Sequence, residues 1–269
     1  MCKAYSKGLS SLIGASQIGG QILNSHLNIR ADAAVLDKSE APNPCASCDV
    51  RHQAVCGSLN HGELAELSAH SRHKDVGTGD CLVFEGDELN AYYVVMNGAF
   101  KLYKLLSDGR RQITGFAFKG DFVGLPYQAD YEVTVEALGV SKLCQLPRET
   151  FENLSVQAPS LGTRLVRMMA ANVAASDDHM LLLGRKTAME RVASFLIWMS
   201  CRAQARGESA LELDVPMSRT DMGDYLGLTV ETVSRTFTKL RKVNAITLGE
   251  RNRLTINNLE SLQDLADGV

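Results

Sequence analysis

The chain has 269 residues, of which 45% are hydrophobic and 22% charged. This composition excludes a largely disordered, collagen-like or coiled-coil protein and suits two compact units or one elaborated unit. With 28 Lys and Arg against 31 Asp and Glu, the formal net charge of −3 excludes a uniformly basic nucleic-acid binder but not a local basic patch. No apolar run approaches the roughly 18 residues of a membrane span, and residues 8–23 contain too many Ser and Gln for a secretory signal. We therefore expect a cytoplasmic protein with no membrane partner.

The first 44 residues show no sustained periodicity and end in a loop-like stretch with two prolines. Such a pattern predicts a poorly ordered extension, to which we assign no function.

Seven cysteines are the unusual feature of the composition, and three of them follow the extension directly. Cys45, Cys48 and Cys56 form a C-x2-C-x7-C pattern, and Cys144 lies about ninety residues further on. In a reducing compartment such cysteines are more often metal ligands or redox thiols than disulfides. Four thiolates around one centre suit zinc or an iron-sulfur cluster, although zinc sites usually pair C-x2-C with a second short-spaced pair, which is absent here.

The remaining cysteines, Cys2, Cys81 and Cys201, are assigned no role, because small-hydrophobe behaviour is the simplest reading of a cysteine in a predicted strand or helix. His52, inside the cysteine loop, is interpreted as a solvent-exposed residue rather than a ligand.

From about residue 64 to residue 147 the sequence consists of short β-rich runs separated by Gly, Asp and Asn turn residues. This spacing predicts a small antiparallel barrel or jelly roll, and we assign residues 45–158 to this unit together with the cysteine segment. One of its separators, Ser107-Asp108-Gly109, is typical of a tight hairpin turn.

After Pro159 the apolar period becomes helical, and we predict one long helix over residues 159–186, broken near Gly184. One apolar row has coiled-coil spacing and consists of Val166, Met169, Val173, Ser176, Met180 and Leu183. A second row, which includes Leu161 and Leu165, can pack on the barrel. Two rows favour a homodimer helix, although one wide stripe inside a monomer core is the alternative.

Residues 187–269 are predicted to form a helix to about Ala205, a helix-turn-helix and a two-stranded wing. Ser218 and Thr229 are suited to cap the two short helices around Gly227. The second helix is basic, since Arg235, Lys239, Arg241 and Lys242 against Glu231 give residues 229–243 a charge of +3.

One face of this second helix carries residues that can read base edges. Glu231 can accept a hydrogen bond from cytosine N4, and Arg235 can bind guanine O6 and N7. The candidate DNA contacts are Glu231, Ser234, Arg235, Thr229, Thr232 and Lys239. A solvated helix face remains the alternative reading of the charges.

Two segments carry a family resemblance. Residues 222–235, MGDYLGLTVETVSR, resemble the recognition segment of the FNR branch of the CRP/FNR transcription regulators, and residues 45–57, CASCDVRHQAVCG, resemble the N-terminal signature of FnrN-type α-proteobacterial regulators. The resemblance implies an α+β chain with a cyclic-nucleotide-binding-like β jelly roll, a dimerisation helix and a winged helix-turn-helix. It further implies a TTGAT-type palindromic operator and a 4Fe-4S cluster held by Cys45, Cys48, Cys56 and Cys144.

The resemblance also implies a contact of Ser107, Asp108 and Gly109 with RNA polymerase. Two departures from the enterobacterial pattern are the x7 spacing, which is x5 there, and Ser176, which is acidic there. Cyclic nucleotide binding is rejected, because Gly120-Asp121-Phe122-Val123-Gly124 offers no Gly-Glu turn and no arginine occurs between Arg111 and Arg148.

The sequence therefore predicts an oxygen-responsive, dimeric regulator that binds double-stranded DNA and activates low-oxygen genes. It is not expected to be an enzyme, because no paired nucleophile and base or phosphate loop is found. A zinc or thiol sensor on the same DNA-binding frame is the alternative, and a cysteine-dependent redox enzyme is a weaker one.

Overall fold

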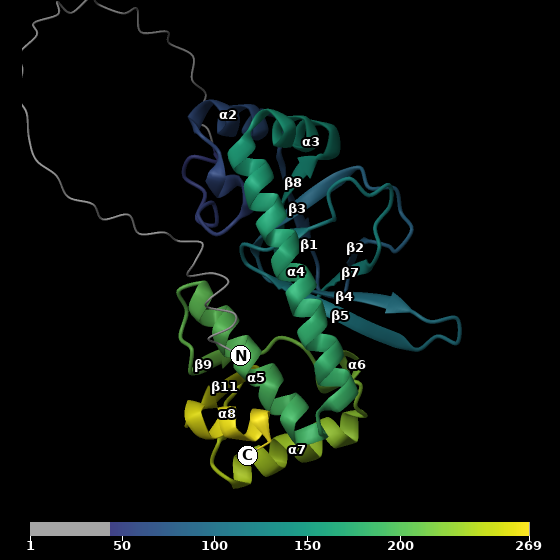
Figure 1. Ribbon diagram of the computed structural model, residues 1–269, viewed down its shortest axis with the longest axis vertical. Helices are drawn as coiled ribbons and strands as arrows, with labels where there is room; N and C mark the ends of the chain where they lie inside the picture. The colour runs from purple at the N-terminus through teal and green to yellow at the C-terminus, as the bar shows by residue number, and fades with distance from the viewer. Residues whose placement is uncertain (1–43, 269) are drawn as a thin grey trace, which may run out of the picture.

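The computed structural model of the protein describes residues 44–268. The predicted extension, apart from its last residue, and Cys2 lie outside the described residues. No helix of the described part is both long and apolar enough to cross a membrane. Figure 1 shows a β-rich unit, a long helix running down its side, and a helical unit at the other end.

The β-rich unit consists of two four-stranded antiparallel sheets with strand orders β1-β8-β3-β6 and β2-β7-β4-β5. Its strands are β1 (Arg72–Val76), β2 (Cys81–Val83), β3 (Ala91–Asn97), β4 (Ala99–Leu105), β5 (Arg111–Phe118), β6 (Phe122–Val123), β7 (Thr134–Ala137) and β8 (Ser141–Pro147). Tyr92, Phe100 and Leu143 are fully buried in the core of this unit. The predicted jelly roll and the mixed α+β class are confirmed.

Two helices of this unit were not predicted from the sequence, α2 (His61–His70) and α3 (Arg148–Gln157). The expectation of β-rich runs from residue 64 is wrong for residues 64–70. Asn60 caps α2 through a reciprocal capping box with Glu63, and Leu64 and Leu67 turn one face of the helix into the core.

The long helix α4 (Pro159–Arg185) buries Leu161 and Leu165 against the β-rich unit and Leu182 against the C-terminal unit. A short 3-10 helix, η1 (Val55–Ser58), packs beside it. The predicted break at Gly184 is not observed, because the helix continues through this glycine to Arg185.

The C-terminal unit contains α5 (Ala188–Ala205), β9 (Glu212–Asp214), α6 (Arg219–Leu226), α7 (Val230–Lys242), β10 (Ile246–Leu248), β11 (Arg253–Ile256) and α8 (Leu259–Asp267). The wing has three strands in the order β10-β11-β9, so the prediction of two strands is corrected. The third strand is only three residues long and has no apolar alternation that the sequence could reveal.

The outer face of the β2-β7-β4-β5 sheet packs directly on the C-terminal unit. Ile113 and Phe116 of β5 share one buried cluster with Phe195 of α5 and Leu226 of α6. The ring of Phe116 lies 5.3 Å from that of Tyr225 and 6.2 Å from that of Phe195, measured between centroids. These contacts join the two units through an apolar interface rather than a linker alone.

The turn before β4 requires glycine at position 98. Gly98 has φ 89°, and a Cβ atom there would lie 2.1 Å from Ser141 Oγ in β8, the strand of Cys144. Gly109 has φ 84° but nothing within 4 Å of a Cβ. We expect Gly109→Ala to cost about 1–2 kcal/mol for the left-handed backbone, and Gly98→Ala to cost about 1–3 kcal/mol more for the overlap. Urea unfolding of both variants measures the difference, and equal losses would contradict it.

Candidate cysteine site and nucleic-acid interface

The cysteine segment folds as a series of turns against the β-rich unit. Cys45, Cys48 and Cys56 are half-buried and pack on its core, as does Cys144 in β8. Cys144 pairs with Val94 of β3 and with His73 of β1. The fold thus brings the distant cysteine to the same side of the core as the three clustered ones, while His52 is exposed, as expected.

The thiols of the four cysteines influence one another electrostatically. Burial, together with the charges of Cys48 and Cys45, raises the pKa of Cys56 to about 11. Burial likewise raises the pKa of Cys144 to about 12, with contributions from Cys45, Cys56 and Cys48. Thiolates at these positions need a compensating positive charge, which a bound metal centre supplies.

Within residues 44–268, however, no three Cys, His, Asp or Glu side chains are arranged as a ready-made metal site. The donor set itself consists of four sulfurs, which fits soft thiolate-bound centres such as zinc or iron-sulfur and does not fit magnesium or calcium. The residues present therefore suit such a centre by the chemistry of their donor atoms, and four-thiolate ligation would require the cysteine turns to draw closer to Cys144.

The cysteine loop also contacts the two long helices, a feature that the sequence reading missed. Arg164 of α4 donates a hydrogen bond from Nη2 to the Gln53 carbonyl at 2.7 Å. Gln53 donates from Nε2 to the Arg206 carbonyl, just after α5, at 3.2 Å. Nothing in the sequence pattern marks Arg164 or Gln53 for this role, except that Gln53 lies between Cys48 and Cys56. One loop residue therefore links the cysteine segment to α4 and to the C-terminal unit.

The helix-turn-helix is built from strong local signals. Ser218 and Asp221 form a capping box at the start of α6, and Gly227 ends α6 with φ 62°. Thr229 Oγ1 accepts a hydrogen bond from Thr232 N at 3.3 Å and caps α7. A Cβ atom at Gly223 would lie 2.6 Å from the Leu228 carbonyl oxygen, so the turn requires glycine at this position.

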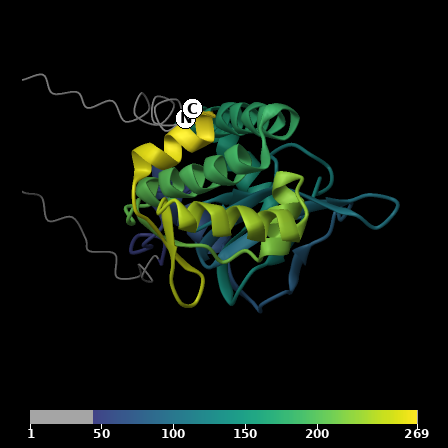
Figure 2. The ribbon, with the colours of Figure 1, turned by 90° about the horizontal axis from the view of Figure 1, so that it is seen from below.

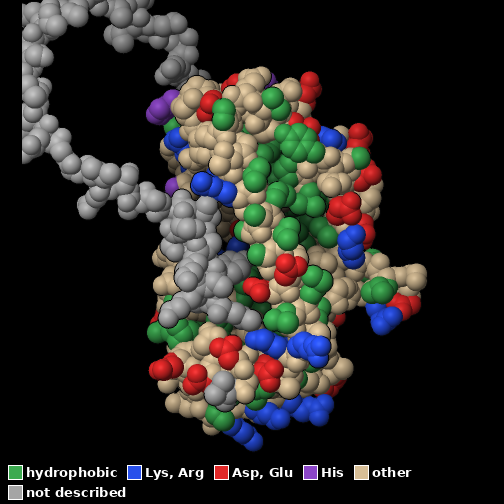
Figure 3. Space-filling model, viewed as in Figure 1, with side chains coloured by type: hydrophobic (Ala, Val, Ile, Leu, Met, Phe, Trp, Pro, Cys, Tyr) green, Lys and Arg blue, Asp and Glu red, His purple; other side chains and the backbone are tan. Residues whose placement is uncertain are grey.

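The two faces of α7 differ sharply. Val233, Phe237 and Leu240 are buried, whereas Glu231, Ser234, Arg235 and Lys239 are exposed on the opposite side. Thr229 is exposed at the cap and Thr232 is half-buried. Lys and Arg side chains gather at the free end of the molecule, over α7 (Figure 3), and the view from below shows α7 lying across this end (Figure 2). The arrangement presents a basic helix to an extended anionic partner.

The predicted dimer seam on α4 is largely unpartnered in the single chain. Val166, Val173 and Met180 are 70%, 62% and 64% exposed. Ser176 is exposed and Met169 half-buried. Leu183 differs, because it is half-buried and packs on the core of the C-terminal unit. Leu183 therefore has a partner within its own chain.

The hairpin of β4 and β5 projects from the body of the molecule and ends in Ser107, Asp108 and Gly109 (Figures 1 and 2). All three residues are exposed, and Asp108 is paired with Arg110 at 2.8 Å. The turn is thus accessible to another macromolecule.

Comparison with known proteins places these features in a family. Residues 190–265 match the Crp-like helix-turn-helix domain and residues 73–157 the cyclic nucleotide-binding domain. The chain is 40% identical to the nitrogen fixation regulation protein FixK of Bradyrhizobium diazoefficiens, over 76% of this chain and 86% of the relative. It is 35% identical to the fumarate and nitrate reduction regulatory protein of Escherichia coli K12, over 82% and 90%.

Among solved structures, FixK2 from Bradyrhizobium japonicum is similar to this chain with a TM-score of 0.68 and 36% identity. The match covers 72% of this chain and 96% of that structure. The likeness therefore extends over both units and not over one domain alone.

The cap of α7 gives a test of what Thr229 does. We expect Thr229→Ala to lower the free energy of unfolding by about 1 kcal/mol, because the N–H of Thr232 loses its acceptor. Thr229→Ser retains the hydroxyl and should keep most of the stability. Urea unfolding measures both variants. Unchanged stability together with weaker DNA binding would assign Thr229 to the DNA contact instead of the cap.

Proposed function

Since the chain belongs to the CRP/FNR family of DNA-binding transcription regulators, we propose that it is an oxygen-responsive activator whose operator binding depends on a 4Fe-4S cluster. Like its relatives it is a transcription regulator and not an enzyme. The proposed ligands are Cys45, Cys48, Cys56 and Cys144.

The observation that carries this proposal is the mutual proximity of four thiols from two separate parts of the chain. The charge of each of three loop cysteines raises the pKa of Cys144 in β8. A bound cluster would supply an oxygen-sensitive inorganic core that needs all four thiolates. Cys144 would then tie the loop to the β-rich unit, and loss of ligation would release it.

The contacts of Gln53 suggest how the state of the loop reaches the rest of the molecule. Gln53 accepts from Arg164 on α4 and donates to the carbonyl of Arg206 after α5. A loop that unfolds loses both hydrogen bonds at once. The orientation of α4 and its partnering with a second copy would change with them.

A homodimer is proposed through the exposed row of α4, with Val166, Val173 and Met180 facing the same residues of the second copy. Two copies of α7 would then meet successive half-sites of a palindrome. Glu231, Ser234 and Arg235 are the proposed readers of a TTGAT-type half-site. The exposed turn of Ser107, Asp108 and Gly109 is the proposed contact with RNA polymerase.

No cyclic nucleotide is proposed as a ligand. In the structure, the ring of Phe122 in β6 packs between those of Tyr92 in β3 and Phe151 in α3, with centroid distances of 5.4 and 5.2 Å. That cyclic nucleotides do not bind stays a prediction, which rests on the absence of a suitably placed Arg and Glu from the sequence.

A thiol sensor without a cluster is the second candidate. It is favoured by the lack of a ready-made three-ligand arrangement within residues 44–268. The same DNA-binding frame would then respond to oxidation of the cysteines rather than to loss of iron.

Anaerobic purification separates these candidates. We expect a brown protein with about four irons per chain that air bleaches with loss of operator binding. Cys144→Ala should abolish the colour as fully as Cys45→Ala, because the site needs four thiolates. Cys81→Ala is the matched control, since Cys81 lies in β2 of the other sheet and should retain the iron. A colourless wild-type protein, with or without zinc, would refute the cluster.

The reading face of α7 gives a separate test. We expect Arg235→Ala to weaken binding to a duplex with a palindrome of TTGAT half-sites by about 1–3 kcal/mol more than to a scrambled duplex, because a bidentate base contact is lost. Lys242→Ala, at the far end of α7, should weaken both duplexes equally. Fluorescence anisotropy measures the affinities of the wild type and both variants for the two duplexes. An equal loss for both duplexes with Arg235→Ala would make Arg235 a phosphate contact.

A further inference from the structure

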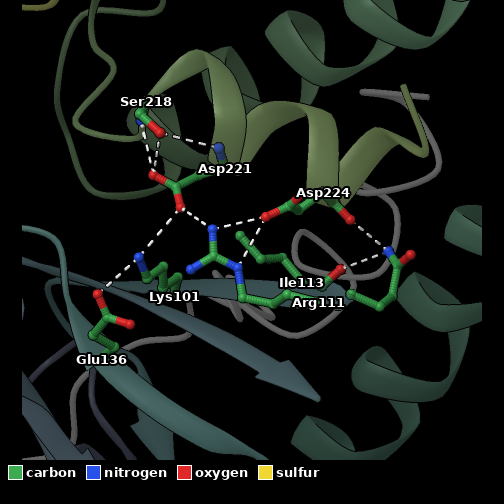
Figure 4. Close-up of polar contacts among 8 residues, drawn as sticks. Lys101, Arg111, Ile113, Glu136, Ser218, Asp221 and Asp224 are labelled. Atoms are coloured by element: carbon green, nitrogen blue, oxygen red, sulfur yellow. Dashed lines mark hydrogen bonds and ion pairs between the residues drawn. The ribbon is translucent and has the colours of Figure 1, made fainter. Parts of the chain in front are cut away.

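A cluster of charged side chains lies between the β-rich unit and the helix-turn-helix, apart from both the cysteines and the reading face. Figure 4 shows it from the side: strands β4 and β5 lie below, and α6 lies above. We call this cluster the polar seat and define it as Lys101, Arg111, Gln112 and Glu136 of the β-rich unit with Ser218, Asp221 and Asp224 of α6.

The contacts in the seat are short, and all but the pair of Lys101 and Glu136 join the β-rich unit to α6. Lys101 Nζ lies 2.8 Å from Glu136 Oε1 and 3.2 Å from Asp221 Oδ1. Arg111 Nη2 lies 2.9 Å from Asp221 Oδ1 and 2.7 Å from Asp224 Oδ2, while its Nε donates to the same Asp224 oxygen at 2.9 Å. Gln112 Nε2 donates to the carbonyl of Asp224 at 2.7 Å.

Burial removes water as an alternative partner for the charges in these contacts. Lys101 is 8% exposed and Asp221 6% exposed, so their charges depend on ionic partners within the cluster and not on water. A small shift of α6 along the sheet would leave buried charges without partners. The seat therefore favours a single placement of α6 on the sheet. Its main effect is on the orientation of α6 and not on the free energy of unfolding.

Asp221 connects this placement to the reading helix. Its Oδ2 accepts hydrogen bonds from the backbone N and the hydroxyl of Ser218 at 3.0 and 2.6 Å, which closes the capping box of α6. Its Oδ1 is left to bind Lys101 and Arg111. The same carboxylate thus starts the first helix of the helix-turn-helix and attaches it to the sheet.

The link from α6 to α7 is rigid. The guanidinium of Arg219 in α6 lies 3.3 Å from the ring centroid of Phe237 in α7. The close approach of Gly223 to the carbonyl of Leu228 sets the turn between them. His179 of α4 contacts the carbonyl of Tyr225 at 2.8 Å and so holds α6 from a second side. An orientation imposed on α6 is therefore passed to α7.

We propose that Lys101, Arg111 and Asp221 are positioning residues for DNA reading, which hold the helix-turn-helix on the β-rich unit so that α7 faces outward at the free end. Lys101 and Asp221 are buried, so they act through α6 and not by touching DNA. The inference does not depend on which group the cysteines bind, because no cysteine belongs to the seat.

The test uses the full-length protein and the pair Arg111 and Asp224, which is less buried than Lys101 and Asp221, so its variants should fold. Arg111→Gln should weaken binding to a duplex with a palindrome of TTGAT half-sites by roughly five- to tenfold, in the range of ordinary coupling between sites. Dimerisation, measured by sedimentation, should not change. Arg110→Gln is the matched control, because the adjacent Arg110 is paired with Asp108 at the exposed tip of the hairpin, away from α6. This variant should bind DNA as the wild type does.

Two further measurements separate positioning from a general loss of stability. Probes on unnatural amino acids at the exposed positions Val140 and Val243 report the distance between the units, and its distribution should broaden in Arg111→Gln without DNA present. The exchanged pair Arg111→Asp with Asp224→Arg should recover part of the affinity and of the narrow distribution, whereas Asp224→Arg alone should not. An unchanged distance distribution and affinity in Arg111→Gln, or an exchanged pair no better than either single variant, would overturn the proposal. Failure of the wild type itself to bind this duplex would count against the proposed operator, and the distance measurement would still decide the role of the seat.

Discussion

The contact between the outer face of one β-sheet and the helix-turn-helix is the interaction on which the architecture depends. Aromatic rings pack across it, with Phe116 of β5 against Phe195 of α5 and Tyr225 of α6. Buried charges fix where α6 lies along the sheet, because Lys101 of β4 pairs with Asp221 of α6 across the boundary. Removing one member of such a buried pair typically costs about 3–5 kcal/mol, whereas replacing both with apolar residues is often neutral. We therefore interpret the pair as orienting α6 on the sheet more than stabilising the fold.

The cysteine loop makes a separate contact with the C-terminal unit. Its residue Gln53 contacts α4 through Arg164 and the end of α5 through Arg206. A change in the loop can therefore act on the dimer helix and on the C-terminal unit together. Two physical links then bear on one reading helix: the polar seat fixes its placement, and the loop contacts carry the proposed signal.

Much of the site could be predicted because it rests on local physics. Caps at Ser218 and Thr229, the left-handed Gly227 and the alternation of buried and exposed residues along α7 all act within a few residues. Other elements could not be predicted, because they depend on contacts with distant parts of the chain. Strand β1 exposes all of its residues except Val76 and exists by pairing with β8, and α2 is short, with only Leu64 and Leu67 buried. Leu183 belongs to the seam by spacing but packs within its own chain, since the C-terminal unit folds back against α4.

The sequence by itself determined the order of the units, the helix-turn-helix with Glu231 and Arg235 on its exposed face, and the spacing of Cys45, Cys48 and Cys56 that suggested a metal centre. These properties follow from composition, caps and periodicity, which act over a few residues. Only the tertiary structure decided that Cys144 reaches the cysteine loop, that Gln53 spans two helices and that Asp221 joins the reading head to the sheet. Those contacts link residues far apart in the chain, and such pairs form only when folding brings both partners together.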